Sequence, residues 1–138
     1  MELPPVGFGT MGIDDPDAVT DALAAGYRHL DTAQIYDNEA AVGAGLAAAD
    51  VPRETVTLAT KLWTDGLAGD TVRESTRTSL GRLGVDRVDL LYAHRPRGEY
   101  EPTETLSALA EIRDDGLTDA VGVSNFTPDQ LATAHEHI

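Results

Sequence analysis

Apolar residues along this chain follow two alternating spacings, and each change of spacing marks the boundary of a predicted element. Short apolar runs rich in β-branched residues are typical of buried strands. Apolar residues three or four positions apart predict a helix that buries one face. The first pattern predicts five strands, over residues 6–10, 27–32, 56–61, 88–94 and 120–124.

A helix is predicted after each strand, because each apolar stripe is preceded by residues that favour a helix N-terminus. The predicted starts are Asp15-Pro16, Asn38, Asp70 or Thr71, Thr103, and Thr127-Pro128, where Gln130 completes a capping box. Glycine follows three of these helices, at Gly26, Gly84 and Gly116. The fifth helix is predicted to continue to the last residue, Ile138.

The second helix has the weakest pattern. It contains Gly43 and Gly45, and each glycine inside a helix costs about 1 kcal/mol relative to alanine. Strands that alternate with helices at the observed spacing nevertheless predict βαβ units and a parallel sheet, which is an α/β fold. No linker or low-complexity segment divides residues 1–138, so a second domain is not expected.

Four ionisable residues gather at the predicted ends of three consecutive strands. Asp31, Lys61 and His94 lie at or just after the C-terminal ends of the second, third and fourth strands. Tyr36 follows the second strand. The C-terminal ends of parallel strands point the same way, and in a (β/α)₈ barrel they surround the mouth where active sites lie. The sequence therefore predicts that the four side chains share one rim.

Together these four groups suit the reduction of a carbonyl. The developing alkoxide needs a proton, and a phenol such as Tyr36 is a poor acid at neutral pH unless a nearby cation stabilises its phenolate. Lys61 would supply that cation and Asp31 would hold it in place. His94 would hydrogen-bond the substrate oxygen. No side chain supplies a hydride, so a cofactor must do so.

Each residue also has an ordinary structural interpretation. Asp31 suits a helix cap or a loop, and Tyr36 suits a half-buried loop position. Lys61 suits a solvated strand end, and His94 a hydrogen-bonded polar position. Lys61 is the only lysine in a chain with nine arginines, which favours a role that arginine cannot fill.

Composition limits the classes of partner that the chain is expected to bind and the cellular location expected for it. The net charge of −14 disfavours nucleic acid and anionic membranes by repulsion. The acids are scattered, which indicates a solvated, halophile-like acidic surface rather than an acidic partner-binding face. No apolar stretch approaches the roughly 20 residues of a membrane helix, and no signal peptide is recognisable, so a cytoplasmic location is expected. The chain has no cysteine, and we predict no metal site.

Gly7-Phe8-Gly9-Thr10-Met11-Gly12 matches the G-x-G-x-x-G fingerprint of Rossmann-type nucleotide binders, and Asp31 follows about 20 residues later. In that fold the glycines open the helix whose N-terminus holds the pyrophosphate. Here the first helix is predicted to start at Asp15-Pro16, several residues after Gly12. A Rossmann-type nucleotide binder is therefore the weaker alternative to a turn that lets the backbone approach a ligand.

The motifs resemble those of the aldo-keto reductase family, in order along the whole chain. They are Gly7-Phe8-Gly9-Thr10; Ala25-Gly26-Tyr27-Arg28-His29-Leu30-Asp31-Thr32-Ala33; Tyr36-Asp37-Asn38-Glu39; Thr60-Lys61-Leu62-Trp63; Ser79-Leu80-Gly81-Arg82-Leu83 leading to Val88-Asp89-Leu90; His94-Arg95-Pro96; and Gly122-Val123-Ser124-Asn125-Phe126. The complete series is specific, although no single motif is.

This resemblance implies an NADPH-dependent oxidoreductase that reduces aldehydes or ketones to alcohols. The fold it implies is α/β, of the (β/α)₈ TIM-barrel type. Tyr36 would be the proton donor, Lys61 and Asp31 would tune it, and His94 would orient the carbonyl.

The resemblance also implies binding residues. Trp63 would line the substrate pocket beside His94, or else be a core or rim aromatic. Gly9, Thr10 and Met11 would approach cofactor and substrate mainly through their backbone, with Asp31 also beside the cofactor. Ser124 and Asn125 would hold the nicotinamide carboxamide, or else cap a loop.

Two features depart from the family's pattern. Arg95 stands where tryptophan is frequent in the His-x-Pro motif. Family members are also about twice as long, so residues 1–138 would form the N-terminal portion of the barrel, with about five of its βα units.

We therefore expect an open sheet with two exposed edges and an apolar inner face, inactive or nearly so in isolation. The expected partner is a complementing C-terminal half, or a second copy through the strand edges. The alternative function is a non-catalytic interaction or regulatory protein that keeps this fold.

Overall fold

Five parallel strands lie side by side in chain order in a computed structural model of this protein, which describes residues 2–138. They are β1 (Phe8–Gly9), β2 (His29–Asp31), β3 (Thr57–Leu62), β4 (Val88–Ala93) and β5 (Thr118–Val123). Each strand pairs with its neighbours in the chain, which leaves β1 and β5 as the two edges of an open sheet. The parallel βα units and the incomplete barrel are thus confirmed.

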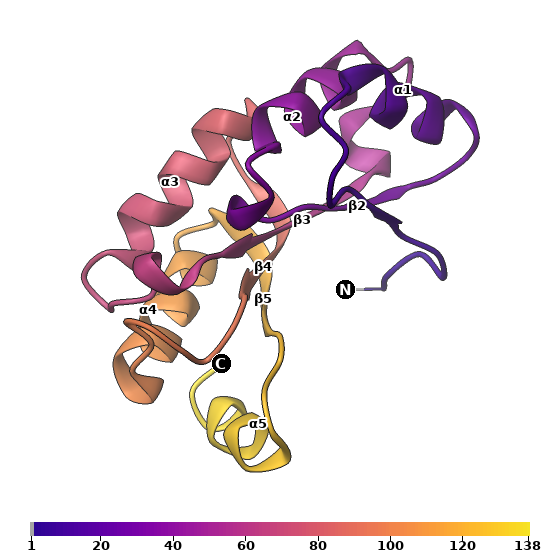
Figure 1. Cartoon of the computed structure of the whole chain (residues 1–138). Coiled ribbons are helices and arrows are strands. Elements are labelled where there is room, and N and C mark those ends of the chain that lie inside the picture. Colours follow the sequence, from indigo (N-terminus) through magenta and orange to yellow (C-terminus); the bar gives the residue numbers. More distant parts are fainter. Residues whose placement is uncertain (1) are drawn as a thin grey trace.

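The helices cover one side of this sheet. They are α1 (Pro16–Ala24), α2 (Glu39–Ala48), α3 (Val72–Leu83), α4 (Pro102–Asp114) and α5 (Pro128–His135). Figure 1 shows α1 to α4 as a continuous layer in which successive helices touch, whereas α5 lies beyond the end of β5. Such a one-sided layer results from βαβ crossovers of a single hand. Within residues 2–138, the helices are too short or too polar to cross a bilayer.

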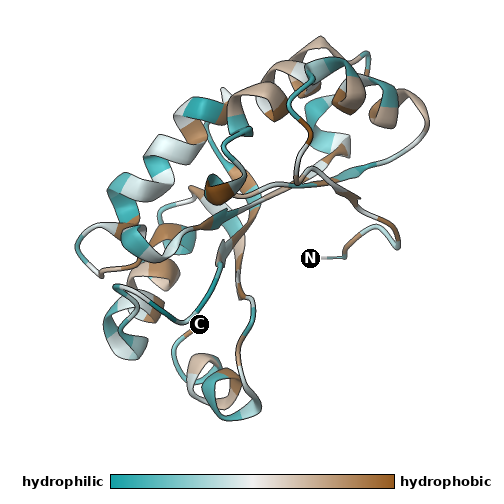
Figure 2. Ribbon diagram, in the orientation of Figure 1, coloured by the Kyte–Doolittle hydropathy of each residue, from teal (hydrophilic) through white to brown (hydrophobic). Residues whose placement is uncertain are grey.

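The hydrophobic core lies between the helix layer and the sheet. Alternate strand residues point into it, including Leu30 of β2, Leu58 and Leu62 of β3, and Leu91 of β4, all fully buried. Helices contribute the facing side chains, such as Leu109 of α4. In Figure 2, hydrophobic residues interrupt the hydrophilic surface of α3 at intervals, as expected for a helix that buries one stripe.

The opposite face of the sheet differs from the apolar surface that the sequence predicts. Alternation places His29 and Asp31 of β2, Lys61 of β3 and Tyr92 of β4 on this inner face. Leu90, an apolar residue of the same face, is itself buried. The large hydrophobic residues exposed within residues 2–138 all lie outside the strands. The prediction was wrong because it weighed the strands as wholes and did not assign their residues to the two faces.

The chain also contains three short 3₁₀ helices that the sequence does not predict. They are η1 (Gln34–Tyr36), η2 (Arg53–Thr55) and η3 (Thr64–Gly66). Periodicity cannot reveal a single turn, because an amphipathic pattern needs several turns to repeat. Tyr36, expected in a loop, is the last residue of η1.

The last helix is shorter than predicted. Its capping box is present, with Thr127 and Gln130 exchanging side-chain to backbone bonds. The helix ends at His135 instead of continuing to Ile138. The N–H groups of the last two residues both donate to the Ala134 carbonyl and so satisfy it at the end of the helix.

The glycines of α2 have a packing role that helix propensity alone does not reveal. A methyl group at Gly43 would overlap the backbone carbonyl of Leu83, at the end of α3. A methyl group at Gly45 would overlap the carbonyl of Pro16 and the side chain of Val19 in α1. The two glycines therefore let α2 approach both neighbouring helices closely.

We expect Gly43→Ala to lower the free energy of unfolding by about 1–3 kcal/mol, because overpacking outweighs the gain in helix propensity. Gly81→Ala is the matched control, since Gly81 lies in α3 with no atom within 4 Å of an added methyl group. That change should stabilise the chain by up to about 1 kcal/mol. Urea denaturation of both variants measures the difference, and a stabilising Gly43→Ala would contradict the packing role.

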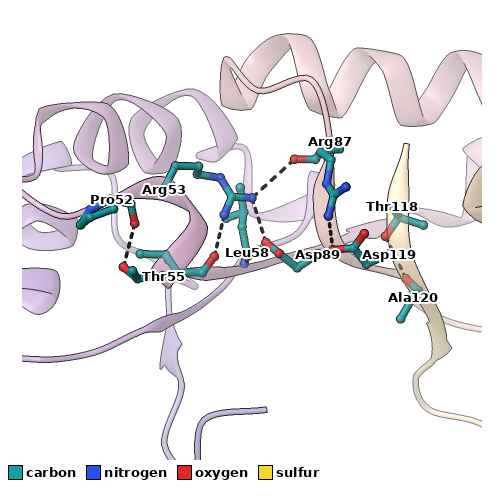
Figure 3. A network of polar contacts seen from close by, with 10 residues as sticks. Pro52, Arg53, Thr55, Leu58, Arg87, Asp89, Thr118, Asp119 and Ala120 are labelled. Carbon is teal, nitrogen blue, oxygen red and sulfur yellow. Dashed lines mark hydrogen bonds and ion pairs between the residues drawn. The ribbon is translucent and has the colours of Figure 1, made fainter. Parts of the chain in front are cut away.

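Ion pairs join the N-terminal ends of the strands (Figure 3). The Asp89 carboxylate accepts hydrogen bonds from the Arg53 guanidinium and from the Leu58 N–H, both at 2.8 Å. Arg87 pairs with Asp119 at the start of β5. This network stabilises the strand register at the end of the sheet opposite the predicted site.

Candidate active site

The four predicted residues meet at the C-terminal ends of β2, β3 and β4. Asp31 is the last residue of β2, Lys61 is next to last in β3, and His94 directly follows β4. Parallel pairing of these strands brings their ends to one rim. Tyr36 reaches the same rim from η1, the single turn that follows β2.

Lys61 is buried and fully engaged by its neighbours. Its Nζ donates to Asp31 Oδ2 at 2.6 Å and to the Thr32 carbonyl at 2.9 Å. The same Nζ lies 5.2 Å from the centre of the Tyr36 ring. The residue is only 8% exposed, which excludes a solvated strand-end lysine. An ammonium that is held between a carboxylate and a phenol can stabilise negative charge on that phenol.

Two aromatic rings pack against His94. The Tyr36 ring centre is 5.9 Å from that of His94, and the Trp63 ring centre is 5.1 Å away on an adjacent strand end, both edge to face. Nδ1 of His94 is enclosed without a hydrogen-bond partner, whereas Nε2 is not enclosed. Trp63 thus lies beside His94, and its place in a substrate pocket stays a prediction.

The charge state of His94 follows from this setting. Burial lowers the pKa of His94, and the positive charges of Lys61 and Arg95 lower it further, while the Asp31 carboxylate opposes them. The imidazole is therefore neutral at neutral pH, since even the ordinary pKa lies near 6.5. A neutral imidazole can donate one hydrogen bond to a substrate oxygen without acting as a cation.

The lowered pKa of His94 predicts how stability depends on pH. The folded chain takes up the His94 proton less readily than the unfolded chain, so the free energy of unfolding falls as the pH drops through about 6.5 and levels off below the folded-state pKa. His94→Gln should remove this part of the acid sensitivity. Thermal unfolding at pH 8 and pH 5 compares it with His135→Gln, an exposed control. An unchanged pH dependence in His94→Gln would contradict the assignment.

A second phenol lies beside the site. Tyr92 of β4 pairs with Lys61 of β3 in the sheet register, so both point to the inner face. Burial raises the pKa of Tyr92, and the Asp31 carboxylate raises it further. Tyr92 therefore holds its proton more firmly than an ordinary tyrosine.

Asn38 has a role that differs from the predicted helix cap. It precedes α2, but its side chain makes no capping bond. Its amide instead donates to the carbonyls of Thr10 and Ile13 at 2.6 and 2.9 Å and accepts from the Thr32 hydroxyl at 2.9 Å. The N–H and hydroxyl of Thr10 both donate to the Asp31 carbonyl. A buried amide thus supports the strand end that presents Asp31, a role that a capping pattern alone does not reveal.

The predicted cofactor residues lie on both sides of the four-residue cluster. Asn125 adopts a left-handed conformation, with φ of 62°, and its amide nitrogen donates to the His94 carbonyl and to Ser124 Oγ, each at 3.0 Å. Gly9 is exposed at the end of β1. The polar groups of Thr10 are all engaged with protein atoms and the residue is fully buried, so direct polar contact with a cofactor would require sharing those bonds.

These residues fit a nicotinamide carboxamide. The Asn125 amide oxygen has no hydrogen-bond partner within residues 2–138, and the Ser124 hydroxyl beside it accepts a bond but keeps its own proton free. An acceptor and a donor side by side match the two halves of a primary amide. In the part of the chain that the structure describes, no three His, Asp or Glu side chains are grouped to hold a metal ion.

The Rossmann alternative fails on the helix that would hold the pyrophosphate. Gly12 lies in a turn, with φ of 78°, and α1 begins only at Pro16. The N-terminus of α1 is already capped by the Asp15 carboxylate, which accepts from the Asp17 N–H at 3.0 Å. A pyrophosphate would meet this negative charge instead of free N–H groups.

Comparison with known proteins agrees with this geometry. The profile of the aldo/keto reductase family matches residues 5–138. Methylglyoxal reductase DkgB of Escherichia coli O157:H7 is 43% identical over 132 residues, which are 92% of this chain and 49% of the relative. An aldo-keto reductase of Mycolicibacterium smegmatis is 43% identical over 138 residues, covering 97% of this chain and 50% of the relative.

Solved structures of the same family also match this chain. The aldo/keto reductase of Brucella melitensis superposes with a TM-score of 0.91 at 36% identity, over 97% of this chain and 53% of the other. MGS-M4, an aldo-keto reductase from a deep-sea metagenome library, superposes at 0.90 with 38% identity, over 96% and 50%. The chain spans about half the length of the curated relatives it matches. By sequence profile, identity and fold, this chain belongs to the aldo/keto reductase family.

Proposed function

We propose that this chain carries the proton-transfer half of an NADPH-dependent carbonyl reductase, in which Tyr36 gives the proton to the substrate oxygen. The observation that carries the proposal is the placement of the Lys61 ammonium against both the Asp31 carboxylate and the Tyr36 ring, with His94 packed against the same ring. A solvated or purely structural lysine does not need this arrangement.

In the proposed reaction, a nicotinamide held by Ser124 and Asn125 would supply the hydride that the carbonyl carbon needs. The Tyr36 hydroxyl gives its proton to the carbonyl oxygen as the alkoxide develops. The Lys61 ammonium stabilises the phenolate that remains, and Asp31 holds the ammonium in place through their ion pair. The neutral His94 donates a hydrogen bond from Nε2 to the same oxygen and so orients it, and solvent later returns a proton to Tyr36.

The substrate is proposed to be a small aldehyde or ketone. Support comes from Trp63, which borders His94 and would limit the pocket, and from relatives named methylglyoxal reductase. Ser124 and Asn125 are proposed to bind the carboxamide of the nicotinamide, with Gly9 lying against the cofactor. We propose NADPH as the cofactor from the family resemblance.

The open sheet indicates that turnover requires additional βα units. We propose that β1 and β5 pair with a complementing C-terminal half of the same fold. A second copy is a poorer fit, because two five-stranded sheets exceed the eight strands of this barrel. The alternative, a non-catalytic protein that keeps the fold, rests on the same open sheet and predicts no turnover even when the barrel is completed.

The hybrid enzyme tests the proposal. We define it as residues 1–138 of this chain joined to the C-terminal half of the Escherichia coli relative, studied in high salt because of the charge of −14. We expect it to oxidise NADPH in the presence of methylglyoxal. The relative's own full-length enzyme serves as the control for the salt condition. A folded hybrid without turnover would favour the non-catalytic alternative.

A second expectation concerns the 138-residue chain alone. We expect no NADPH binding in the micromolar range, because only the nicotinamide end of the cofactor has predicted contacts here. Fluorescence titration with NADPH measures the affinity. Micromolar binding by the isolated chain would contradict the proposal that the remaining cofactor contacts lie in a complementing half.

A further inference from the structure

Gln34 occupies a junction between three elements that surround the site. Its amide oxygen accepts a hydrogen bond from the Trp63 N–H, at the end of β3, at 2.7 Å. Its amide nitrogen lies 3.0 Å from the hydroxyls of Ser75 and Ser79 in α3, and 3.2 Å from the Ser75 carbonyl. Gln34 itself is the first residue of η1, the turn that ends in Tyr36.

The chemistry of this junction requires an amide. One polar atom at the end of the side chain must accept from a backbone N–H, and the other must donate to oxygen atoms. Among side chains of this length and shape, a carboxamide does both. A carboxylate would keep the bond to Trp63 but would face the Ser75 and Ser79 oxygens without a proton to donate. A methionine side chain of similar size would lose the bonds on both sides.

The surroundings hold Gln34 against these partners. The residue lines a cleft of about 440 Å³ between η1, η3 and α3, together with Trp63 and Ser75. The wall of the cleft is close-packed, since a methyl group at Gly66 would overlap the Ser75 hydroxyl. Movement of η1 relative to α3 would therefore break the bonds of Gln34.

We infer that Gln34 is a positioning residue for the proposed reaction, because it fixes Tyr36 and Trp63 relative to each other and to His94, against which both rings pack. Tyr36 is two residues from Gln34 in the same turn, and Trp63 is bonded to it through the backbone. Both rings pack edge to face on His94. This inference rests on the proposed function for its catalytic meaning, but the geometry can be tested without turnover.

The test is the proton NMR spectrum of the His94 ring in the 138-residue chain. Two edge-to-face aromatic rings shift the His94 C–H resonances away from those of exposed histidines, and His94→Gln identifies the His94 signals. In Gln34→Met, we expect the His94 signals to lose at least about half of this ring-current shift. Gln34→Glu keeps the oxygen that accepts from the Trp63 N–H. In this variant the His94 signals should therefore lose a smaller share of their ring-current shift.

Thr78→Ala is the matched control. Thr78 lines the same cleft, but its hydroxyl donates only to the Glu74 carbonyl of its own helix, so its loss should leave the His94 signals unchanged. Unchanged His94 signals in a folded Gln34→Met, or an equal change in Thr78→Ala, would overturn the inference. Unfolding of both Gln34 variants, judged by circular dichroism, would also overturn it, because Gln34 would then be needed for the fold as a whole. Since the spectrum involves neither cofactor nor substrate, failure of the proposed reaction would not alter this result.

Discussion

Tyr36→Phe should lower kcat of the hybrid enzyme for methylglyoxal by about 100- to 10,000-fold, which is the usual contribution of a positioned general acid. Phenylalanine keeps the ring that packs against His94 and the Lys61 ammonium, and it removes only the hydroxyl that we propose as the proton donor. The affinity for NADPH should stay unchanged, because no predicted cofactor contact involves Tyr36. Stopped-flow or steady-state measurement of NADPH oxidation gives kcat, and a fluorescence titration gives the affinity.

Tyr92→Phe is the matched control for this prediction. It removes the second phenol of the site, whose pKa is raised by burial and by Asp31 and which we assign no part in proton transfer. We expect kcat to remain within a few-fold of the unmodified hybrid. A Tyr36→Phe hybrid with nearly full turnover, or a Tyr92→Phe hybrid without it, would contradict the assignment of the proton donor.

Asp31→Asn should lower the free energy of unfolding of the chain by about 3 kcal/mol, because it leaves a buried ammonium without its counter-charge. The Lys61 side chain is only 10% exposed, and its remaining strong acceptor would be the Thr32 carbonyl. Asparagine has nearly the same volume as aspartate, so packing changes little. Urea denaturation measures the loss, and the double variant Asp31→Asn with Lys61→Met should recover part of it.

The exposed pair of Arg73 and Asp115 is the matched control for that prediction. Both side chains are more than a third exposed, so Asp115→Asn should change stability by less than about 1 kcal/mol. Equal losses in Asp31→Asn and Asp115→Asn would show that burial does not distinguish the two ion pairs. That outcome would remove the physical basis for a buried ion pair that holds Lys61 beside Tyr36.

The order of elements was predictable because strands and helices repeat over several residues. The strand ends were predictable for the same reason, and they locate Asp31, Lys61 and His94 without any knowledge of distances. In a parallel sheet, consecutive strands deliver their C-terminal residues to one rim, so three correct strand predictions bring the site together.

Other features depend on contacts between distant segments, and local pattern carries no information about them. Gly43 and Gly45 lower helix propensity, yet the structure uses them for close helix packing. Asn38 stands at a cap position, but its side chain bonds to the loop that follows β1. Gln34 belongs to a single turn, and its partners lie about 30 and 40 residues further along the chain.

The polarity of the inner face of the sheet shows a different limit of prediction from the sequence. The strands are apolar on average, and we therefore expected both faces of the sheet to be apolar. In the structure, alternation directs Leu30, Leu62 and Leu91 to the helices and leaves Asp31, Lys61 and Tyr92 on the inner face. Assigning each strand residue to a face before judging its polarity would have given the correct result.

One experiment compares NADPH oxidation by three proteins under identical conditions, with methylglyoxal as substrate. They are the 138-residue chain alone, the hybrid enzyme, and the hybrid carrying Tyr36→Phe. We expect turnover by the unmodified hybrid only. Turnover by the isolated chain, or equal turnover by the two hybrids, would contradict the claim that this chain supplies the proton donor and that a complementing half completes the site.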